Sequence, residues 1–256
     1  MLDHISHSQI NMWLRCPRQW KYRYVDGLKI PPSGALIVGS AYHSALECNF
    51  IQKVESRKDL PLNDCLDLFS DAWEDRLLEE ELVIWEQLGP GESKDQGASL
   101  VEEYIVSTSP SVQPVQVERT IYTEVAGVKF VCRVDLENDQ RAVIDHKTSA
   151  RAYSQDDVDG DIQASAEAFA LCRPIVFYNH IALKLKRPRI QIVKSYRRQA
   201  DIDWWVDMAT GVVRQMESGV APPRSIDAFG KSGFWCSERF CGYYERCRGE
   251  LTRSYA

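Results

Sequence analysis

The stretch VKFVCRVDLENDQRAVIDHKT, residues 128–148, predicts two β-strands joined by a short polar turn. Its two apolar runs are rich in β-branched and aromatic residues, and the Asn-Asp pair between them is typical of a tight turn. Asp135 and Asp145 then lie on adjacent antiparallel strands. Lys147 follows Asp145 by two positions, which places both side chains on one face of the strand. The hairpin therefore brings two carboxylates and one ammonium group together.

Such a set of side chains indicates a metal site. Carboxylate oxygens suit magnesium or manganese, and Lys147 would position a water molecule or stabilise charge on a phosphate. By itself, an Asp-x-Lys sequence in a strand is more often a solvated face with a weak ion pair. The catalytic interpretation therefore depends on other parts of the chain.

The composition indicates one catalytic domain in a soluble protein. The 256 residues, 44% of them apolar, can form a core of ordinary size. The net charge of -6 argues against a generally cationic surface, so a local basic region or a metal would have to bind phosphate. No apolar run approaches the roughly 20 residues that cross a bilayer, and MLDHISHSQ lacks the apolar segment of a signal peptide. We expect a cytoplasmic protein, in the host cytoplasm if its source is viral, with no membrane partner.

Eight cysteines without a secretory signal indicate reduced thiols, some of which can be ligands. Cys236, Cys241 and Cys247 have the spacing C-x4-C-x5-C, and Cys16 is the fourth partner that we expect. Four thiolates complete either a zinc site or an iron-sulfur cluster, and the spacing alone does not choose between them. A site of this kind would connect the two ends of the chain. Unligated cysteines remain the alternative.

Helical patterns dominate the chain before the hairpin. Residues 6–25 predict a helix that a Cys-Pro pair interrupts, and residues 35–54 predict a second helix. Residues 63–88 have an acidic helical pattern, residues 89–97 (GPGESKDQG) predict a loop, and residues 98–107 predict another helix.

Strand and helix patterns alternate around and after the hairpin. Residues 115–125 predict a strand, residues 154–171 a helix, residues 175–185 and 190–196 two more strands, and residues 201–216 a final helix. The whole pattern predicts an α/β fold.

Several polar residues in these elements could join the metal site. His43 and Glu47 are four apart and so share one helix face, Gln163 lies on a later helix, and Glu118 could approach from the strand before the hairpin. Residues 183–198 contain seven cations and no acid, which is compatible with a phosphate-binding track or with exposed strand ends.

Together these segments resemble RecB-like nucleases of the PD-(D/E)XK superfamily, especially the iron-sulfur branch that includes AddB nuclease domains and the Cas-four nucleases of CRISPR adaptation. The resemblance covers nearly the whole chain. It rests on the segments SHSQINMWLRCPRQWKYRYVDGL, GSAYHSALE, FVCRVD, VIDHKT and DIQASAEAFAL.

The resemblance implies a PD-(D/E)XK (restriction-endonuclease-like) core with a central mixed β-sheet flanked by helices. It also implies one nuclease domain over residues 1–256. Residues 1–34 and 222–256 would form the cysteine-cluster region, and residues 35–221 the helical part and the nuclease core.

The resemblance also assigns roles to residues of this chain. It implies magnesium or manganese held by His43, Asp135, Asp145 and the main-chain carbonyl of His146. The catalytic set that it implies is Asp135, Asp145, Lys147 and Gln163. The ligands that it implies for a [4Fe-4S] cluster, with zinc as the alternative, are Cys16, Cys236, Cys241 and Cys247.

Three features depart from the family pattern. Cys132 stands where relatives commonly have glycine, three residues before the first aspartate. Glu167 stands where they often have tyrosine, four residues after the glutamine. The gap between Cys236 and Cys241 is longer than the two-residue gap common in relatives.

The function that follows is a metal-dependent DNA exonuclease acting on single-stranded DNA or on DNA ends, 5′ to 3′ by analogy. No nucleotide-binding P-loop motif is present, so any helicase or recombination protein would be a separate partner. The alternative is a catalytically weak nucleic-acid-binding module stabilised by an iron-sulfur or zinc cluster.

Overall fold

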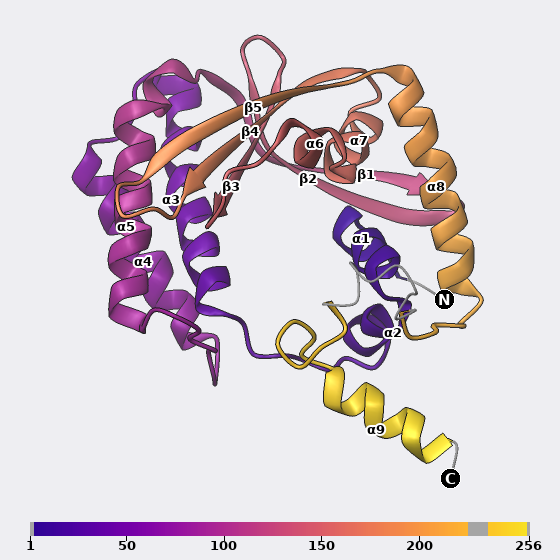
Figure 1. The fold of residues 1–256 in the computed structure, drawn as a ribbon. Coiled ribbons are helices and arrows are strands. Elements are labelled where there is room, and N and C mark those ends of the chain that lie inside the picture. The colour runs from indigo at the N-terminus through magenta and orange to yellow at the C-terminus, as the bar shows by residue number, and fades with distance from the viewer. Residues whose placement is uncertain (1–2, 225–234, 255–256) are drawn as a thin grey trace. The chain divides into compact units, whose positions relative to one another are not determined.

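The computed structural model describes residues 3–224 and 235–254. The protein has an α/β fold in which a mixed β-sheet is flanked by helices (Figure 1). The strands are β1 (Pro114–Val125), β2 (Val128–Asn138), β3 (Val143–Ser149), β4 (Ile175–Leu183) and β5 (Arg189–Arg197). The helices are α1 (His7–Arg15), α2 (Pro17–Trp20), α3 (Gly34–Ser56), α4 (Leu62–Leu78), α5 (Pro90–Ser107), α6 (Gln155–Asp159), α7 (Ile162–Ala170), α8 (Gln199–Glu217) and α9 (Tyr244–Ser254). Two short helical segments are η1 (Lys21–Val25) and η2 (Ser109–Ser111).

Capping chemistry sets the boundaries of the first helices. The Ser6 hydroxyl accepts a hydrogen bond from the backbone N–H of Gln9 and so begins α1. The predicted break at Cys16 is present, and Pro17 becomes the first residue of α2, where a missing N–H has no intrahelical partner to lose.

The predicted loop over residues 89–97 is wrong, because α5 begins there. Pro90 occupies the first helical position, and the Glu92 carboxylate accepts a hydrogen bond from the backbone N–H of the capping residue at 3.2 Å. The predicted acidic helix is also shorter than expected, since α4 ends at Leu78. Proline and glycine mark the start of a helix here.

In the part of the chain that the structure describes, the sheet has five strands in the order β1-β2-β3-β4-β5. Strands β2 and β3 are antiparallel, β3 and β4 are parallel through a crossover containing α6 and α7, and β4 and β5 are antiparallel. The turn between β1 and β2 is Ala126-Gly127, with φ of 52° and 83°. Positive φ at both positions suits a two-residue hairpin, because this turn matches the twist of the strands.

The chain divides into two compact units. Unit 1 comprises residues 1–30, 122–131 and 203–256, and unit 2 comprises residues 31–121 and 132–202.

In unit 2, α3, α4 and α5 pack side by side and cover one face of the sheet (Figure 1). Their buried side chains form one hydrophobic cluster with Ile144 and Ala182. On the other face, Ile181 and Leu183 pack with Val158 of α6. Successive side chains of β4 point to opposite faces, so one strand contributes to both layers.

Unit 1 has its own buried aromatic core. Ile5 forms a parallel bridge with Phe130 of β2, and the Phe130 ring packs edge-on against Trp205 of α8 with centroids 5.2 Å apart. The indole N–H of Trp13 donates to the side-chain oxygen of Gln215 at 3.3 Å. These contacts tie α1 to α8 and to the β1–β2 hairpin.

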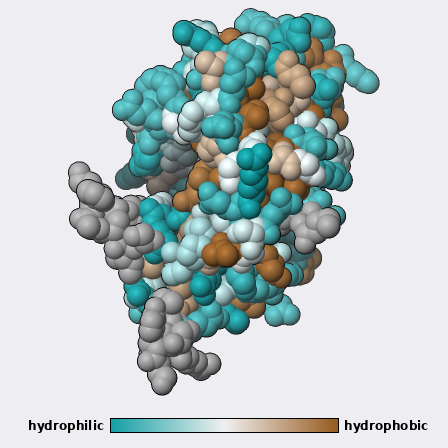
Figure 2. Space-filling model, turned by 90° about the vertical axis from the view of Figure 1, so that its right-hand side faces the viewer, coloured by the Kyte–Doolittle hydropathy of each residue, from teal (hydrophilic) through white to brown (hydrophobic). Residues whose placement is uncertain are grey.

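Among the described residues, no helix is both long and apolar enough to cross a membrane. Hydrophilic and hydrophobic residues are interspersed on the face that Figure 2 shows.

Candidate metal centre

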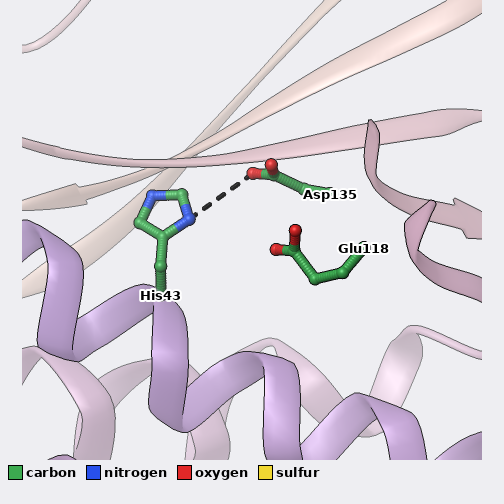
Figure 3. A group of neighbouring side chains, drawn as sticks. All are labelled: His43, Glu118 and Asp135. Carbon is green, nitrogen blue, oxygen red and sulfur yellow. Dashed lines mark ion pairs between the residues drawn. The ribbon is translucent and has the colours of Figure 1, made fainter. Parts of the chain in front are cut away.

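His43, Glu118 and Asp135 place their possible ligand atoms within 4.8 Å of one another (Figure 3). They come from three elements, α3, β1 and β2. In residues 3–224 and 235–254, no other group of three His, Cys, Asp or Glu side chains is this close. One imidazole and two carboxylates form a donor set that suits manganese or magnesium. The three residues therefore fit a divalent cation.

Asp135 is the centre of this group. Its Oδ2 lies 3.5 Å from His43 Nδ1 and accepts the backbone N–H of His146 at 3.1 Å. Burial raises the pKa of Asp135 and the nearby charge of Asp145 raises it further, while His43 acts in the opposite direction. A cation at this point would stabilise the ionised carboxylate.

Glu118 lies beside Asp135 in an unusual backbone conformation, with φ of 49°. A residue other than glycine rarely adopts that region, and such outliers gather at functional sites. Arg133 of β2 donates its Nε–H to the Glu118 carboxylate, and its Nη2 lies 3.8 Å from Glu47 of α3. Burial raises the pKa of Glu118 to about 7, and the charge of Asp135 adds to this effect.

Asp145 belongs to a second, adjoining group on β3. Its Oδ1 accepts from Gln163 Nε2 at 2.7 Å, and its Oδ2 accepts from Asn179 at 2.9 Å and from Lys147 Nζ at 2.8 Å. The Lys147 ammonium also donates to the Gln163 side-chain oxygen at 3.1 Å. Burial lowers the pKa of Lys147, but the carboxylates of Asp145 and Asp161 outweigh it and hold that pKa above its usual value. The Lys147 ammonium is therefore charged, and its contacts with Asp145 and Gln163 fix its orientation.

Glu167 supports Gln163 from within α7. Gln163 Nε2 donates to Glu167 Oε1 at 2.9 Å in addition to Asp145. Burial raises the pKa of Glu167 well above its usual value, and Asp145 and Asp135 add to the effect. Its Oε2 has no hydrogen-bond partner in the described structure. A protonated, neutral Glu167 is compatible with this setting.

The His146 side chain is buried against Tyr104 and Phe50, and its Nδ1 lies 3.9 Å from Asp135 Oδ2. Its Nε2 is 2.9 Å from the Tyr104 hydroxyl, which is also 2.8 Å from His180 Nδ1, and its ring stacks on Phe50. Burial lowers the pKa of His146 well below its usual value and that of His180 to about 4. Both imidazoles are therefore neutral near pH 7. The hydrogen bond to Asp135 comes from the main-chain N–H of His146, since a neutral imidazole forms no ion pair with that carboxylate.

The four cysteines of interest lie together in unit 1. Cys16 lies at the break between α1 and α2, Cys236 and Cys241 in the turns before α9, and Cys247 in α9. Cys16, Cys236 and Cys241 line one small pocket, where the Arg15 guanidinium lies over the Trp235 ring.

All four thiols are free. Burial raises the pKa of Cys241 and Cys247, and the neighbouring Cys16 and Cys236 raise it further. Thiols with raised pKa need a strongly positive partner to ionise, and a zinc ion or the irons of a cluster would be such partners.

The structure unites most of the residues that the sequence singled out, but in two groups. His43 and Asp135 form one, and Asp145, Lys147 and Gln163 form the other, with the His146 main chain between them.

Glu118 was expected only to approach the metal site, and neither Asn179 nor Tyr104 was singled out from the sequence. Glu118 was visible as an acid near the hairpin, although its left-handed backbone has no sequence signal. Asn179 carries no motif, and it reaches Asp145 because β3 and β4 pair with Asp145 opposite Asn179.

The chain is similar to solved structures in fold. A crystal structure of a candidate exonuclease from Eubacterium rectale matches with a TM-score of 0.61 and 16% identity, covering 89% of this chain and 86% of that one. A structure of the protein SSO0001 covers 92% of this chain and 91% of its own with 13% identity, but its TM-score of 0.36 supports no argument. None of the curated proteins compared with the chain matched it.

A comparison with models of protein families also found a match. The model of the PD-(D/E)XK nuclease superfamily matches residues 4–248, nearly the whole chain. That span contains both side-chain groups of the candidate metal centre. This protein therefore belongs to the PD-(D/E)XK nuclease superfamily.

Proposed function

We propose that this protein is a metal-dependent DNA exonuclease that hydrolyses phosphodiester bonds in single-stranded DNA or at DNA ends. The observation that carries the proposal is the meeting of His43, Glu118 and Asp135 beside the Asp145-Lys147 pair. Nucleases of this superfamily generally use divalent metals, and the donor set fits one. The name of the Eubacterium rectale protein is compatible with exonuclease action.

His43, Asp135, Asp145 and the main-chain carbonyl of His146 would hold magnesium or manganese, and we add Glu118 to this set. A metal in this place lowers the pKa of a bound water and neutralises charge on the scissile phosphate.

The chain's own groups complete the site. Lys147, fixed by Asp145 and Gln163, would orient the attacking water or stabilise the charge that develops on the phosphate. Arg133 compensates Glu118 in the structure, and a bound metal would take over this role.

We further propose that Cys16, Cys236, Cys241 and Cys247 bind a [4Fe-4S] cluster, as the resemblance to the iron-sulfur branch implies. Three of the four cysteines line one small pocket in unit 1, which supports a shared site for them. Zinc remains the alternative at the same four thiolates.

Lys147→Ala tests the proposed reaction. A time course on single-stranded oligonucleotides labelled at either end, with manganese, with magnesium and with a chelator, reports cleavage and its direction. We expect the wild type to shorten the strand only with metal, and Lys147→Ala to be slower by about 10²- to 10³-fold, because it loses one charged donor to the phosphate.

Lys58→Ala is the matched control, because Lys58 is an exposed lysine after α3, outside both groups of the centre. Both variants should fold like the wild type. Undiminished cleavage by Lys147→Ala with manganese would contradict the role of Lys147. Metal-free binding to DNA without any metal-dependent product would instead favour a binding module.

A further inference from the structure

A pocket of about 510 Å³ lies apart from the metal centre in unit 2. It is lined by the turn between β2 and β3, the start of β4 and the end of β5. Ile175 on its wall precedes Asn179, the partner of Asp145, by four residues along β4, or about 13 Å. Its volume is in the range of pockets that hold small molecules.

Three guanidinium groups give the pocket a positive character. Arg141 Nε lies 3.8 Å from Glu137 Oε1, and Arg173 Nη2 lies 3.0 Å from Glu137 Oε2. In the described structure, the Arg198 side chain forms no hydrogen bond or ion pair, although its backbone N–H donates to the Asp201 carboxylate. One carboxylate thus pairs with two of the three cations, and among the described residues the Arg198 side chain stays unpaired, in a protein whose net charge is -6.

Arg173 is the least available of the three cations, because its buried Nη2 forms an ion pair with Glu137. The side chain of Arg141 is 72% exposed, and Arg198 is exposed as well. Arg141 and Arg198 are therefore the guanidinium groups that a bound anion can reach.

The pocket also has an aromatic and apolar side. Tyr196 is 56% exposed, and the Lys194 ammonium lies 4.9 Å from the centre of its ring. Ile175 and Val176 line the wall beside it. The adjoining Arg197 is turned inward, because its Nη2 donates to the Val158 carbonyl at 2.9 Å, and it holds the end of β5 in place.

We propose that this pocket binds a nucleoside phosphate unit, with Arg141 and Arg198 on the phosphate and Tyr196 against the base. Guanidinium groups match phosphate oxygens in pairs, and aromatic rings stack on any base. The unit would be a free mononucleotide or part of a DNA strand bound outside the cleavage site. Binding of a DNA strand in this pocket rests on the proposed function, because that function makes DNA the substrate.

Binding without metal tests the pocket. Thymidine monophosphate and a fluorescent oligothymidine are titrated in the presence of a chelator into wild type, Arg198→Ala, Tyr196→Ala and Lys58→Ala. We expect Arg198→Ala and Tyr196→Ala each to weaken binding about tenfold, because each removes one charged or stacking contact, and Lys58→Ala to bind like the wild type.

Competition between the two probes identifies the source of the unit. Displacement of the oligonucleotide by the mononucleotide indicates a site for one free nucleotide. Oligonucleotide binding that the mononucleotide does not displace, but that both pocket variants weaken, indicates a strand. Equal binding by the wild type and both pocket variants would overturn the proposal.

The outcome is separable from that of the proposed function. Wild-type cleavage with unchanged binding in Arg198→Ala and Tyr196→Ala means that the pocket proposal is wrong and the nuclease stands. If the wild type does not cleave DNA but Arg198→Ala loses binding, the pocket proposal stands and the nuclease proposal is wrong. Thermal melting of each variant shows that lost binding does not reflect unfolding.

Discussion

At the scale of residues, one amide connects the parts of the proposed catalytic site. The Gln163 side-chain oxygen accepts from Lys147, while its Nε2 donates to Asp145 and Glu167. The lysine can bond only to the oxygen, so these contacts define the orientation of the amide. The buried Glu167 carboxyl group thus accepts a hydrogen bond from the Gln163 amide and holds it in place.

Replacing Glu167 should therefore change the reaction rate more than substrate binding. Glu167→Leu leaves Gln163 without its second acceptor, so we expect kcat to fall about tenfold with little change in KM. Glu167→Gln retains an acceptor oxygen and should restore most of the rate, which a loss of packing alone would not explain. Steady-state kinetics on a single-stranded oligonucleotide measure both values. Equal rates for Glu167→Leu and the wild type would contradict the positioning role.

At the scale of elements, close packing of helices in unit 2 supports the sheet that carries Asp145 and Lys147. Gly97 of α5 lies against Phe69 of α4, and a Cβ atom there would collide with the Phe69 ring. A second link joins the end of α3 to the following loop and η2, because Lys53 and Ser109 both bond to Asp59.

Gly97→Ala should destabilise the protein by about 1 to 3 kcal/mol, because the added methyl group forces Phe69 or a helix to move. Gly91→Ala is the matched control in the same helix, since its Cβ would meet no atom within 4 Å. It should be neutral or stabilising by about 0.5 to 1 kcal/mol. Chemical denaturation measures both. Equal stability of the two variants would show that α4 and α5 are not in contact at Gly97.

Asp59→Asn should cost about 3 kcal/mol of unfolding free energy at pH 7, because it leaves the buried Lys53 ammonium without its charge partner. Burial raises the pKa of Asp59, but hydrogen bonds from Asn49, Lys53 and Ser109 outweigh it and lower that pKa. The folded pKa is thus below the unfolded value of about 3.9.

The sign of the pH dependence follows from that shift. The contribution of Asp59 is fully present above the unfolded pKa and is lost as the pH falls through the folded pKa. The stability difference between wild type and Asp59→Asn should be constant from pH 7 to about 5 and should narrow below about pH 4. Asp67→Asn, at an exposed position of α4, should show no such difference. A difference that persisted unchanged at pH 3 would contradict the assignment to Asp59.

At the scale of the whole molecule, the chain has two separate centres of possible metal chemistry. The candidate metal centre lies in unit 2, and the four cysteines lie in unit 1, which contains residues 1–30 and 203–256. In unit 1 the Tyr22 hydroxyl donates to Glu250, and the Tyr243 hydroxyl donates to the Leu28 carbonyl at 2.8 Å. The contacts around the cysteines thus join segments more than 200 residues apart.

Anaerobically purified protein should be brown and contain iron and sulfide. Cys16→Ser should lose both and should lower the thermal stability of unit 1, because a ligated cluster connects the two chain ends. Cys172→Ser, an exposed cysteine outside the group, is the control and should keep the colour. Iron analysis and visible absorption measure the cluster. A colourless wild type with stoichiometric zinc would refute the choice of iron and sulfur.

The α/β class, the strands around Asp135 and Asp145 and the helix break at Cys16 could all be predicted from the sequence, because periodicity, turn residues and proline act over a few neighbouring residues. The two-residue spacing of Asp145 and Lys147 also predicted that both side chains share one face of the strand. The position of Glu118 beside Asp135 and the hydrogen bonds from Asn179 and Gln163 to Asp145 are seen only in the folded structure. These contacts depend on strand register, on the left-handed backbone at Glu118 and on helix packing. Such features arise from interactions between distant segments, so no local pattern encodes them.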